Sequence, residues 1–196
     1  MSPRSVVADW VTSRPPRSFF TPQDVPGTTS AVETALSRLA RPDGPVVRVR
    51  QGLYWKKPPA TAFGTGSPDP TDAAFAAAGP GAGLAGASAA NAVGLSTQVS
   101  RQPIIAVVGR PPKGLRGVTF TSRSNPQRIR LSRLEVTVLE ALRDFPNNSE
   151  LSWPEARARI RRLANDGRVD LQKIAEVAAL DRRAGLTDRM SDLQAA

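Results

Sequence analysis

The sequence predicts an α+β protein made of a small domain followed by a medium-sized one. Helical hydrophobic spacing and strand-like alternation both occur along the chain, and each is confined to its own blocks. The 196 residues are enough for two hydrophobic cores. Residues 58–70 are rich in Pro, Gly, Ser, Thr and Ala, which is typical of a linker or an extended strap. We therefore expect domains at residues 1–57 and 71–196, joined by a linker at 58–70.

The first 25 residues predict two helices. Apolar residues recur at helical spacing over residues 6–11, which favours a first helix. Thr21-Pro22 is typical of a helix start, because proline suits the first turn, and it predicts a short second helix over residues 21–25. These helices would precede the part of the domain that carries its charge.

A third, amphipathic helix is predicted from about residue 29 to residue 41. We expect Thr29 or Ser30 to cap it, with Glu33 completing a capping box three residues after Ser30. Pro42, Asp43 and Gly44 end the helix. The stripe that faces the core is Val32, Ala35, Leu36 and Leu39. The outer face carries Ser30, Thr34, Ser37, Arg38 and Arg41.

A β-hairpin is predicted directly after this helix. Valines alternate partly with arginines over residues 46–50, Gln51-Gly52 supplies the turn, and residues 53–55 return as a second strand. The hairpin carries four cations, at Arg48, Arg50, Lys56 and Lys57.

Three helices followed by a basic hairpin is the element order of a winged helix-turn-helix DNA-binding domain. Hydroxyl groups can bond phosphates or base edges, and arginine can bond guanine bidentately. We expect the outer face of the third helix in the major groove and the four hairpin cations on phosphates or in the minor groove. A single such domain usually reads a short half-site, so an inverted repeat bound by two copies is expected. The alternative is a small α+β domain with a solvated basic face.

The charge balance favours a polyanionic partner. The chain has 27 Lys and Arg against 17 Asp and Glu, a formal net charge of +10, and residues 1–60 hold 9 of the basic and 4 of the acidic side chains. With neither Cys nor His, the chain can form no disulfide, thiolate nucleophile, imidazole base or Cys/His zinc site. We expect no catalytic residue, metal or cofactor. No apolar run reaches membrane-helix length and no signal-peptide core is present, so a cytoplasmic protein without a membrane partner is expected.

The second domain is predicted to be a small sheet followed by a helical bundle. Helices are expected at residues 70–78 and 87–93, strands at 103–108, 118–121 and 128–131, and further helices beginning near residues 132, 152, 171 and 186. Glu135 and Arg143 are expected on the outside of the first of these later helices. Gly79, Gly81, Gly83 and Gly86 favour tight helix packing, with a phosphate-cradling loop as the alternative.

A cluster of arginines in the second domain predicts a possible second nucleic-acid surface. Its members are Arg157, Arg159, Arg161 and Arg162. The alternative is a solvated helix face whose charge is balanced by Glu155, Asp166 and Asp170.

Three segments carry a resemblance to a known family. They are Gln51-Gly52-Leu53-Tyr54-Trp55, similar to a Gly-hydrophobic-Tyr wing, together with residues 86–98 and residues 134–142. In their order and spacing the chain resembles the AbiEi-type antitoxins, transcriptional regulators of bacterial toxin-antitoxin pairs whose toxin is an AbiEii-type nucleotidyltransferase. The resemblance covers nearly the whole chain and implies repression of its own operon and neutralisation of the toxin through the second domain.

The sequence therefore predicts a DNA-binding repressor and antitoxin without catalysis of its own, which binds its own promoter and opposes a nucleotidyltransferase-like toxin directly or indirectly. Two alternatives remain. One is an enzyme acting on nucleic acid or nucleotides through the small-residue loop and carboxylates such as Asp69 and Asp72, although no paired acidic motif lies at a strand end. The other is an adaptor that binds only proteins.

Overall fold

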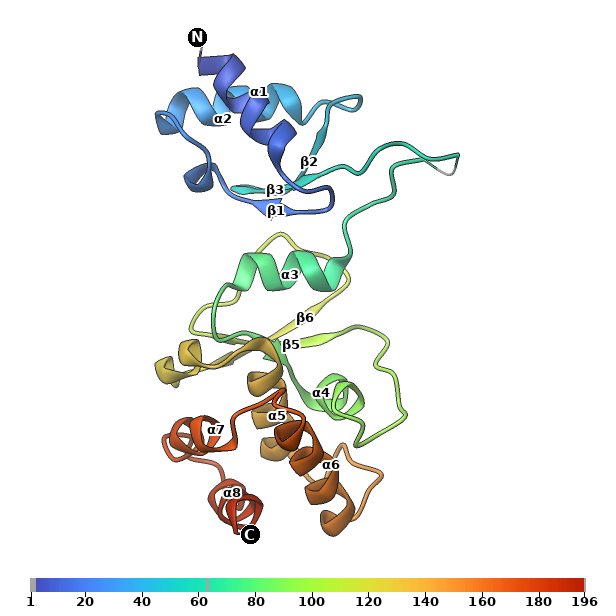
Figure 1. Cartoon of the computed structure of the whole chain (residues 1–196), viewed down its shortest axis with the longest axis vertical. Helices are drawn as coiled ribbons and strands as arrows, with labels where there is room; N and C mark the ends of the chain where they lie inside the picture. Colours follow the sequence, from blue (N-terminus) through green and yellow to red (C-terminus); the bar gives the residue numbers. More distant parts are fainter. Residues whose placement is uncertain (1–2, 63, 196) are drawn as a thin grey trace. The chain divides into compact units, whose positions relative to one another are not determined.

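The computed structural model describes residues 3–62 and 64–195, and the chain is α+β as predicted (Figure 1). It divides into two compact units. Unit 1 holds the described residues up to Ala77 together with Lys113–Arg116, and unit 2 holds Ala78–Pro112 and the described residues from Gly117 onward. In the described part of the chain, no helix is both long enough and apolar enough to cross a membrane.

Unit 1 is built from helices and a small antiparallel sheet, with strand order β1-β3-β2. The predicted helices and hairpin are confirmed. Strand β1 was not predicted, because a two-residue strand offers no alternation to detect. The elements are α1 (Pro3–Ser13), β1 (Phe19–Phe20), the 3-10 helix η1 (Pro22–Asp24), α2 (Thr29–Leu39), β2 (Val46–Arg50), β3 (Leu53–Lys56) and α3 (Pro70–Ala78).

The core of unit 1 joins α1 and α2 to one face of the sheet. Phe20 of β1 stacks on Tyr54 of β3, with ring centroids 5.9 Å apart, and Trp10 of α1 meets Phe20 edge-on at 5.3 Å. Val32 and Leu36 of α2 are buried in the same cluster. This packing fixes how α2 is rotated about its axis, and therefore which of its side chains face outward.

Helix α2 begins at Thr29, as expected, but its predicted N-cap is wrong by one to two residues. Its N-cap is Thr28, so Ser30 lies within the first turn and Glu33 completes no capping box there. The backbone of Thr28 is extended, as an N-cap requires, and its carbonyl accepts the amide of Val32 at 3.0 Å. The Thr34 hydroxyl instead bonds the Ser30 carbonyl at 2.9 Å. The Glu33 carboxylate is therefore not committed to the helix end.

Unit 2 is a three-stranded sheet followed by a group of helices, as expected. Strand β5 is central, antiparallel to β4 and parallel to β6. Its residues Ile105 to Val107 are buried, which agrees with the continuous apolar run. The elements are β4 (Gly83–Leu84), α4 (Gly86–Ala92), β5 (Ile104–Val108), β6 (Thr119–Arg123), the 3-10 helix η2 (Pro126–Arg130), α5 (Arg133–Asp144), α6 (Trp153–Asn165), α7 (Leu171–Ala178) and α8 (Leu186–Gln194).

The strand predicted at residues 128–131 is wrong, because this segment forms η2 and its C-cap. The Asn125 side chain accepts the amide of Gln127 at 3.0 Å, and Pro126 at the first position sets a helical φ. Arg128 is completely buried whereas Ile129 is 56% exposed, the reverse of what their polarity suggests. The third strand of the sheet is β4 instead.

Close packing of β4 against α5 explains one of the glycines. A Cβ atom on Gly83 would lie 2.6 Å from Cγ1 of Val136, so only glycine allows this approach. The Thr137 hydroxyl also accepts the amide of Leu84 at 3.1 Å. The tight packing predicted for the small-residue segment is confirmed at this position.

Glu135 is buried, which corrects the prediction that it lies outside α5. Its carboxylate accepts the Ser132 amide at 2.7 Å and the Asp170 amide at 3.1 Å. Burial by itself raises the pKa of Glu135, but these hydrogen bonds, the Ser132 hydroxyl and the charge of Lys173 outweigh it and lower the pKa below its usual value. Arg143, the second residue expected outside, is partly buried.

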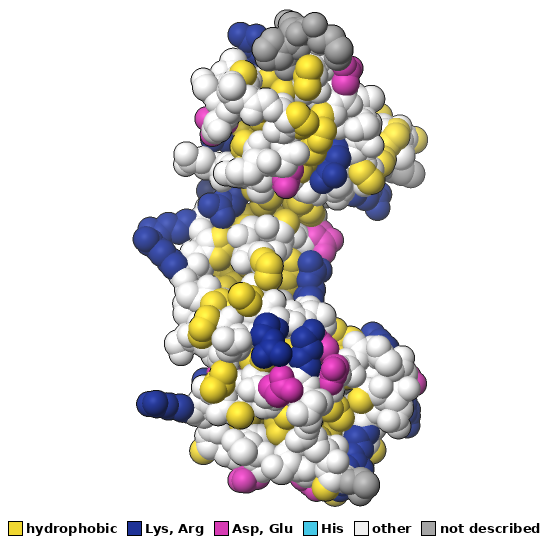
Figure 2. Space-filling view, turned by 60° about the vertical axis from the view of Figure 1, so that its left-hand side comes forward, with side chains coloured by type: hydrophobic (Ala, Val, Ile, Leu, Met, Phe, Trp, Pro, Cys, Tyr) yellow, Lys and Arg dark blue, Asp and Glu magenta, His cyan; other side chains and the backbone are white. Residues whose placement is uncertain are grey.

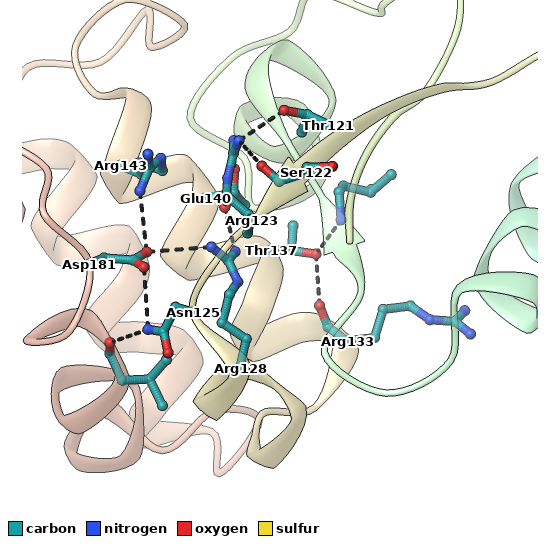
Figure 3. A network of polar contacts seen from close by, with 12 residues as sticks. Thr121, Ser122, Arg123, Asn125, Arg128, Arg133, Thr137, Glu140, Arg143 and Asp181 are labelled. Carbon is teal, nitrogen blue, oxygen red and sulfur yellow. Dashed lines mark hydrogen bonds and ion pairs between the residues drawn. The ribbon is translucent and has the colours of Figure 1, made fainter. Parts of the chain in front are cut away.

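Unit 2 also contains a buried ion network between η2, α5, β6 and the end of α7 (Figure 3). Glu140 is fully buried and binds Arg128, also fully buried, and Arg123, whose Nη2 lies 2.5 Å away. Burial raises the pKa of Glu140, but the hydrogen bond from Arg123 and the charges of Arg128 and Arg123 lower it overall. Asp181 extends the network, 3.4 Å from Arg128 and 3.3 Å from Arg143.

Candidate nucleic-acid interface

An open recess of about 440 Å³ lies between α2 and the β2–β3 hairpin of unit 1. Its polar lining comes from two segments that are separate in sequence. Helix α2 contributes Glu33, Thr34, Ser37 and Arg38, and the hairpin contributes Arg48, Gln51, Gly52 and Tyr54, while Pro22 of η1 closes one side.

The sequence of α2 places its polar side chains in this recess. Val32, Ala35 and Leu36 are buried, so the residues that alternate with them at helical spacing must point outward. In the hairpin, Arg48 is paired with Tyr54, and the register shifts between Arg48 and Arg50. The chain then turns at Gly52, whose φ of +75° is a conformation that favours glycine.

The recess offers both donors and one charged acceptor. Arg38 and Arg48 are exposed, and among the described residues neither has an ion-pair or hydrogen-bond partner. Of the acids that the structure describes, Glu33 alone lines the recess. Guanidinium and hydroxyl groups can bond phosphates or guanine, whereas a carboxylate repels phosphate and can accept from the amino group of cytosine.

Sequence reasoning missed Glu33, Gln51 and Tyr54 as lining residues. Glu33 could have been found, because it stands four residues before Ser37 on the same helix face. It was assigned to a capping box instead. Gln51 was interpreted only as a turn residue, and Tyr54 only as part of a strand.

The structure brings together four of the nine residues predicted to bind DNA, namely Thr34, Ser37, Arg38 and Arg48. Ser30 and Arg41 are exposed on or just beyond α2 but do not line the recess. Arg50 is partly buried and also lies outside the lining.

The remaining two predicted residues, Lys56 and Lys57, bind carbonyl groups of the chain itself. The Lys56 Nζ donates to the carbonyls of Thr12, at 2.6 Å, and Arg14, at 2.5 Å, at the end of α1. The Lys57 Nζ donates to the carbonyl of Pro42 at 2.6 Å, just after α2. Cations there compensate the negative end of a helix, which gives both lysines a structural role irrespective of DNA.

The predicted second basic surface on α6 has mostly internal contacts. Arg157 donates to the carbonyl of Ala195 at 3.1 Å, and Arg161 to the carbonyl of Leu193 at 3.1 Å, so both cap the end of α8. Arg159 donates to the carbonyl of Val93 after α4. Of the four, Arg162 alone has no partner within the described residues.

The acids expected to balance that cluster act elsewhere or lie exposed. Glu155 binds Ser152 in the capping box at the start of α6, and Asp170 caps α7 by accepting the Lys173 amide at 3.1 Å. Asp166 is the C-cap residue of α6. The charge partner of Arg157 is instead Asp192 of α8, at 3.4 Å. On the face drawn in Figure 2, Lys and Arg form separate clusters rather than one continuous stripe.

Comparison with known proteins gives little information. No family model matches the chain. No curated protein matches it significantly. A solved structure to which it is similar is the crystal structure of the RV2827C protein from Mycobacterium tuberculosis, with 19% sequence identity and a TM-score of 0.47, covering 96% of this chain and 74% of that chain.

Proposed function

We propose that unit 1 is a winged helix-turn-helix that binds double-stranded DNA, with α2 as its recognition helix and the β2–β3 hairpin as its wing. One observation carries the proposal: Arg38 of α2 and Arg48 of the hairpin, which have no partner among residues 3–62 and 64–195, line the same open recess. Such a pair can contact a base edge and the adjacent phosphate backbone at once.

The lining suggests how the contacts are divided. Arg38 bonds guanine, and Ser37 bonds a nearby base or phosphate. The Thr34 hydroxyl donates its proton to the Ser30 carbonyl, so toward DNA it can accept from a base amino group. Glu33 lies toward the N-terminal half of α2, where recognition helices contact base edges, and accepts from a cytosine amino group. Arg48 and Gln51 of the wing bind the backbone. Two copies bind an inverted repeat, since one domain reads only a short half-site.

The biological role that we propose is repression of a toxin-antitoxin operon, with unit 2 opposing a nucleotidyltransferase-like toxin in the cytoplasm. This part rests on the resemblance to AbiEi-type antitoxins, carried by residues 51–55, 86–98 and 134–142. The chain has no catalytic step in this role. It opposes the toxin by direct contact, by modifying it or through its target.

A mobility-shift assay with the DNA upstream of the gene, competed by unrelated DNA of equal length, tests the DNA-binding proposal. We expect a shift that unrelated DNA competes for poorly and that Arg38→Ala with Arg48→Ala abolishes. Arg17→Ala is the matched control, because Arg17 is an exposed cation of unit 1 outside the recess. The proposal would be contradicted if both DNAs competed equally well. It would also be contradicted if Arg17→Ala lowered the DNA affinity as much as the double variant does, per positive charge removed.

The antitoxin role needs a separate measurement. Cells that express the partner toxin are expected to grow when the full chain is supplied, and the Arg38→Ala variant should still rescue them while a promoter reporter is derepressed. If loss of DNA binding always removes rescue at equal protein level, the two roles do not belong to separate units.

A further inference from the structure

A second recess, of about 340 Å³, opens beside the buried ion network of unit 2. Its lining is mostly polar and comes from the end of β6, the end of α5 and the turn after α7. The lining residues are Ser122, Arg123, Ser124, Arg143, Leu180, Asp181 and Arg182.

The wall of this recess is held in one arrangement by the network behind it (Figure 3). The Arg123 guanidinium donates to both carboxylate oxygens of Glu140, at 2.9 and 2.5 Å. Asp181 accepts from Asn125 at 3.2 Å and from Arg143 at 3.3 Å. These bonds fix Arg123 and Arg143 before any ligand arrives, so this part of the wall is preorganised.

Several donors at the recess are left without partners. Arg143 uses only its Nη1, toward Asp181. Among residues 3–62 and 64–195, the Arg182 side chain and the Ser124 hydroxyl have no hydrogen-bond or ion-pair partner. These guanidinium and hydroxyl donors are the groups that bind phosphate oxygens in proteins.

Arg143 and Arg182 are not needed to compensate the helix ends nearby. The C-terminal carbonyls of α5 are already bonded by two other arginines, Arg189 to Leu142 at 3.1 Å and Arg183 to Arg143 at 3.3 Å. The Val177 carbonyl of α7 accepts from the side-chain Nδ2 of Asn125 at 2.9 Å. Arg143 and Arg182 are therefore available to bind a ligand in the recess.

Charge in and around the recess does not cancel. The cations are Arg123, Arg128, Arg143 and Arg182. The anions in direct contact with them are Glu140 and Asp181, and Asp144 acts on Arg123 from farther away. A net positive charge remains, which one bound anion would neutralise.

We propose that this recess binds the phosphate group of a small ligand, held by Arg143, Arg182 and the Ser124 hydroxyl. Its volume is at the low end of small-molecule sites, about 300 to 1,000 Å³, and suits a ligand rather than a polymer. Leu180, 59% exposed at the rim, offers an apolar contact for the remainder of an organic phosphate. Inorganic phosphate and a nucleoside monophosphate share the chemistry that the recess recognises.

Calorimetric titration of the full chain at constant ionic strength tests the site, with inorganic phosphate, adenosine monophosphate and adenosine as probes. Both phosphates should bind and adenosine should not. Tighter binding of the nucleotide would mark an organic phosphate as the ligand, and equal binding would mark the phosphate alone. Arg182→Gln should weaken binding roughly tenfold, because a charge-assisted hydrogen bond is lost. Ser124→Ala should weaken it less.

Arg168→Gln is the matched control, since it removes the same charge from an exposed residue of unit 2 outside the recess. It should bind like the parent chain. Equal weakening by both arginine variants would reduce the effect to overall charge and overturn the site. The site would also be overturned if millimolar phosphate did not bind to the parent chain. The same holds if Arg182→Gln lowered the affinity for DNA and left the affinity for phosphate unchanged. All three substituted residues are exposed, and circular dichroism checks that each variant is folded.

Discussion

The arginines of the two units differ in what they can still bind. In unit 1, Arg38 and Arg48 stand exposed around an open recess, and neither has a partner in the part of the chain that the structure describes. In unit 2, Arg128 is completely buried between Glu140 and Asp181. Arg38 and Arg48 are therefore available to a ligand, whereas Arg128 is held by carboxylates within the fold. A count of positive residues cannot separate the two roles, whereas burial and partners can.

Removal of Glu140 should have the largest effect. Glu140→Gln leaves the buried Arg128 without its closer carboxylate, with Asp181 still 3.4 Å away, so we expect the free energy of unfolding to fall by about 3–5 kcal/mol in urea denaturation. Glu176→Gln is the control, since Glu176 forms an exposed pair with Arg130 at 3.3 Å and should cost at most about 1 kcal/mol. If both variants lost a similar free energy of unfolding, burial would not determine how much each carboxylate stabilises the fold.

Acid should destabilise unit 2 through the same carboxylates. The pKa of Glu140 and that of Glu135 are lowered in the folded chain. Their contribution is complete above the ordinary glutamate pKa of about 4.3 and is lost as the pH falls through the lowered folded values. Unfolding followed by circular dichroism between neutral pH and pH 2 checks this. A Glu140→Gln chain should show a shallower loss, and an unchanged slope would contradict the assignment.

In unit 1 the corresponding substitution should affect binding rather than stability. Arg38→Ala should cost roughly 1 to 3 kcal/mol on the operator and much less on random DNA, because only the specific complex loses a bidentate pair. The free energy of unfolding should change by no more than about 0.5 kcal/mol, since Arg38 is exposed. Equal losses on both DNAs would make Arg38 a phosphate contact.

The smallest effect that we expect is a difference between two hairpin cations, Arg48 and Lys57, in the salt dependence of DNA binding. Arg48→Ala should reduce the slope of log affinity against log salt by about 0.9, the value for one lost phosphate contact. Lys57→Gln should change that slope less, because its Nζ is bonded to the Pro42 carbonyl. If Lys57→Gln reduced the slope more than Arg48→Ala, Lys57 rather than Arg48 would be the phosphate contact, and the recess would not be part of the interface.

The local pattern of the sequence was enough to predict the helices and the hairpin. Helix α2 and strands β2 and β3 follow from hydrophobic period and turn chemistry, which involve residues close in sequence. Of the residues that line the recess, Thr34, Ser37, Arg38 and Arg48 were predicted from that pattern.

Interactions between distant residues were not predictable in this way. Lys56 bonds a carbonyl 44 residues earlier, and Arg161 one 32 residues later, so both looked like free surface cations. Glu135 looked external because its second partner, the amide of Asp170, is 35 residues away. Long-range hydrogen bonds like these leave no periodic signal, and they explain most of the corrected assignments.

The composition of unit 1 has a consequence for how the chain emerges during synthesis. This unit includes Lys113–Arg116, which follow residues 78–112 of unit 2. Translation delivers residues in order, at about 5 to 20 per second, and domains generally fold as they are completed. Unit 1 therefore lacks one of its segments until residue 116 has left the ribosome. A gene fragment that stops at residue 77 encodes the hydrophobic core of unit 1, from Val7 to Tyr54, without this later segment.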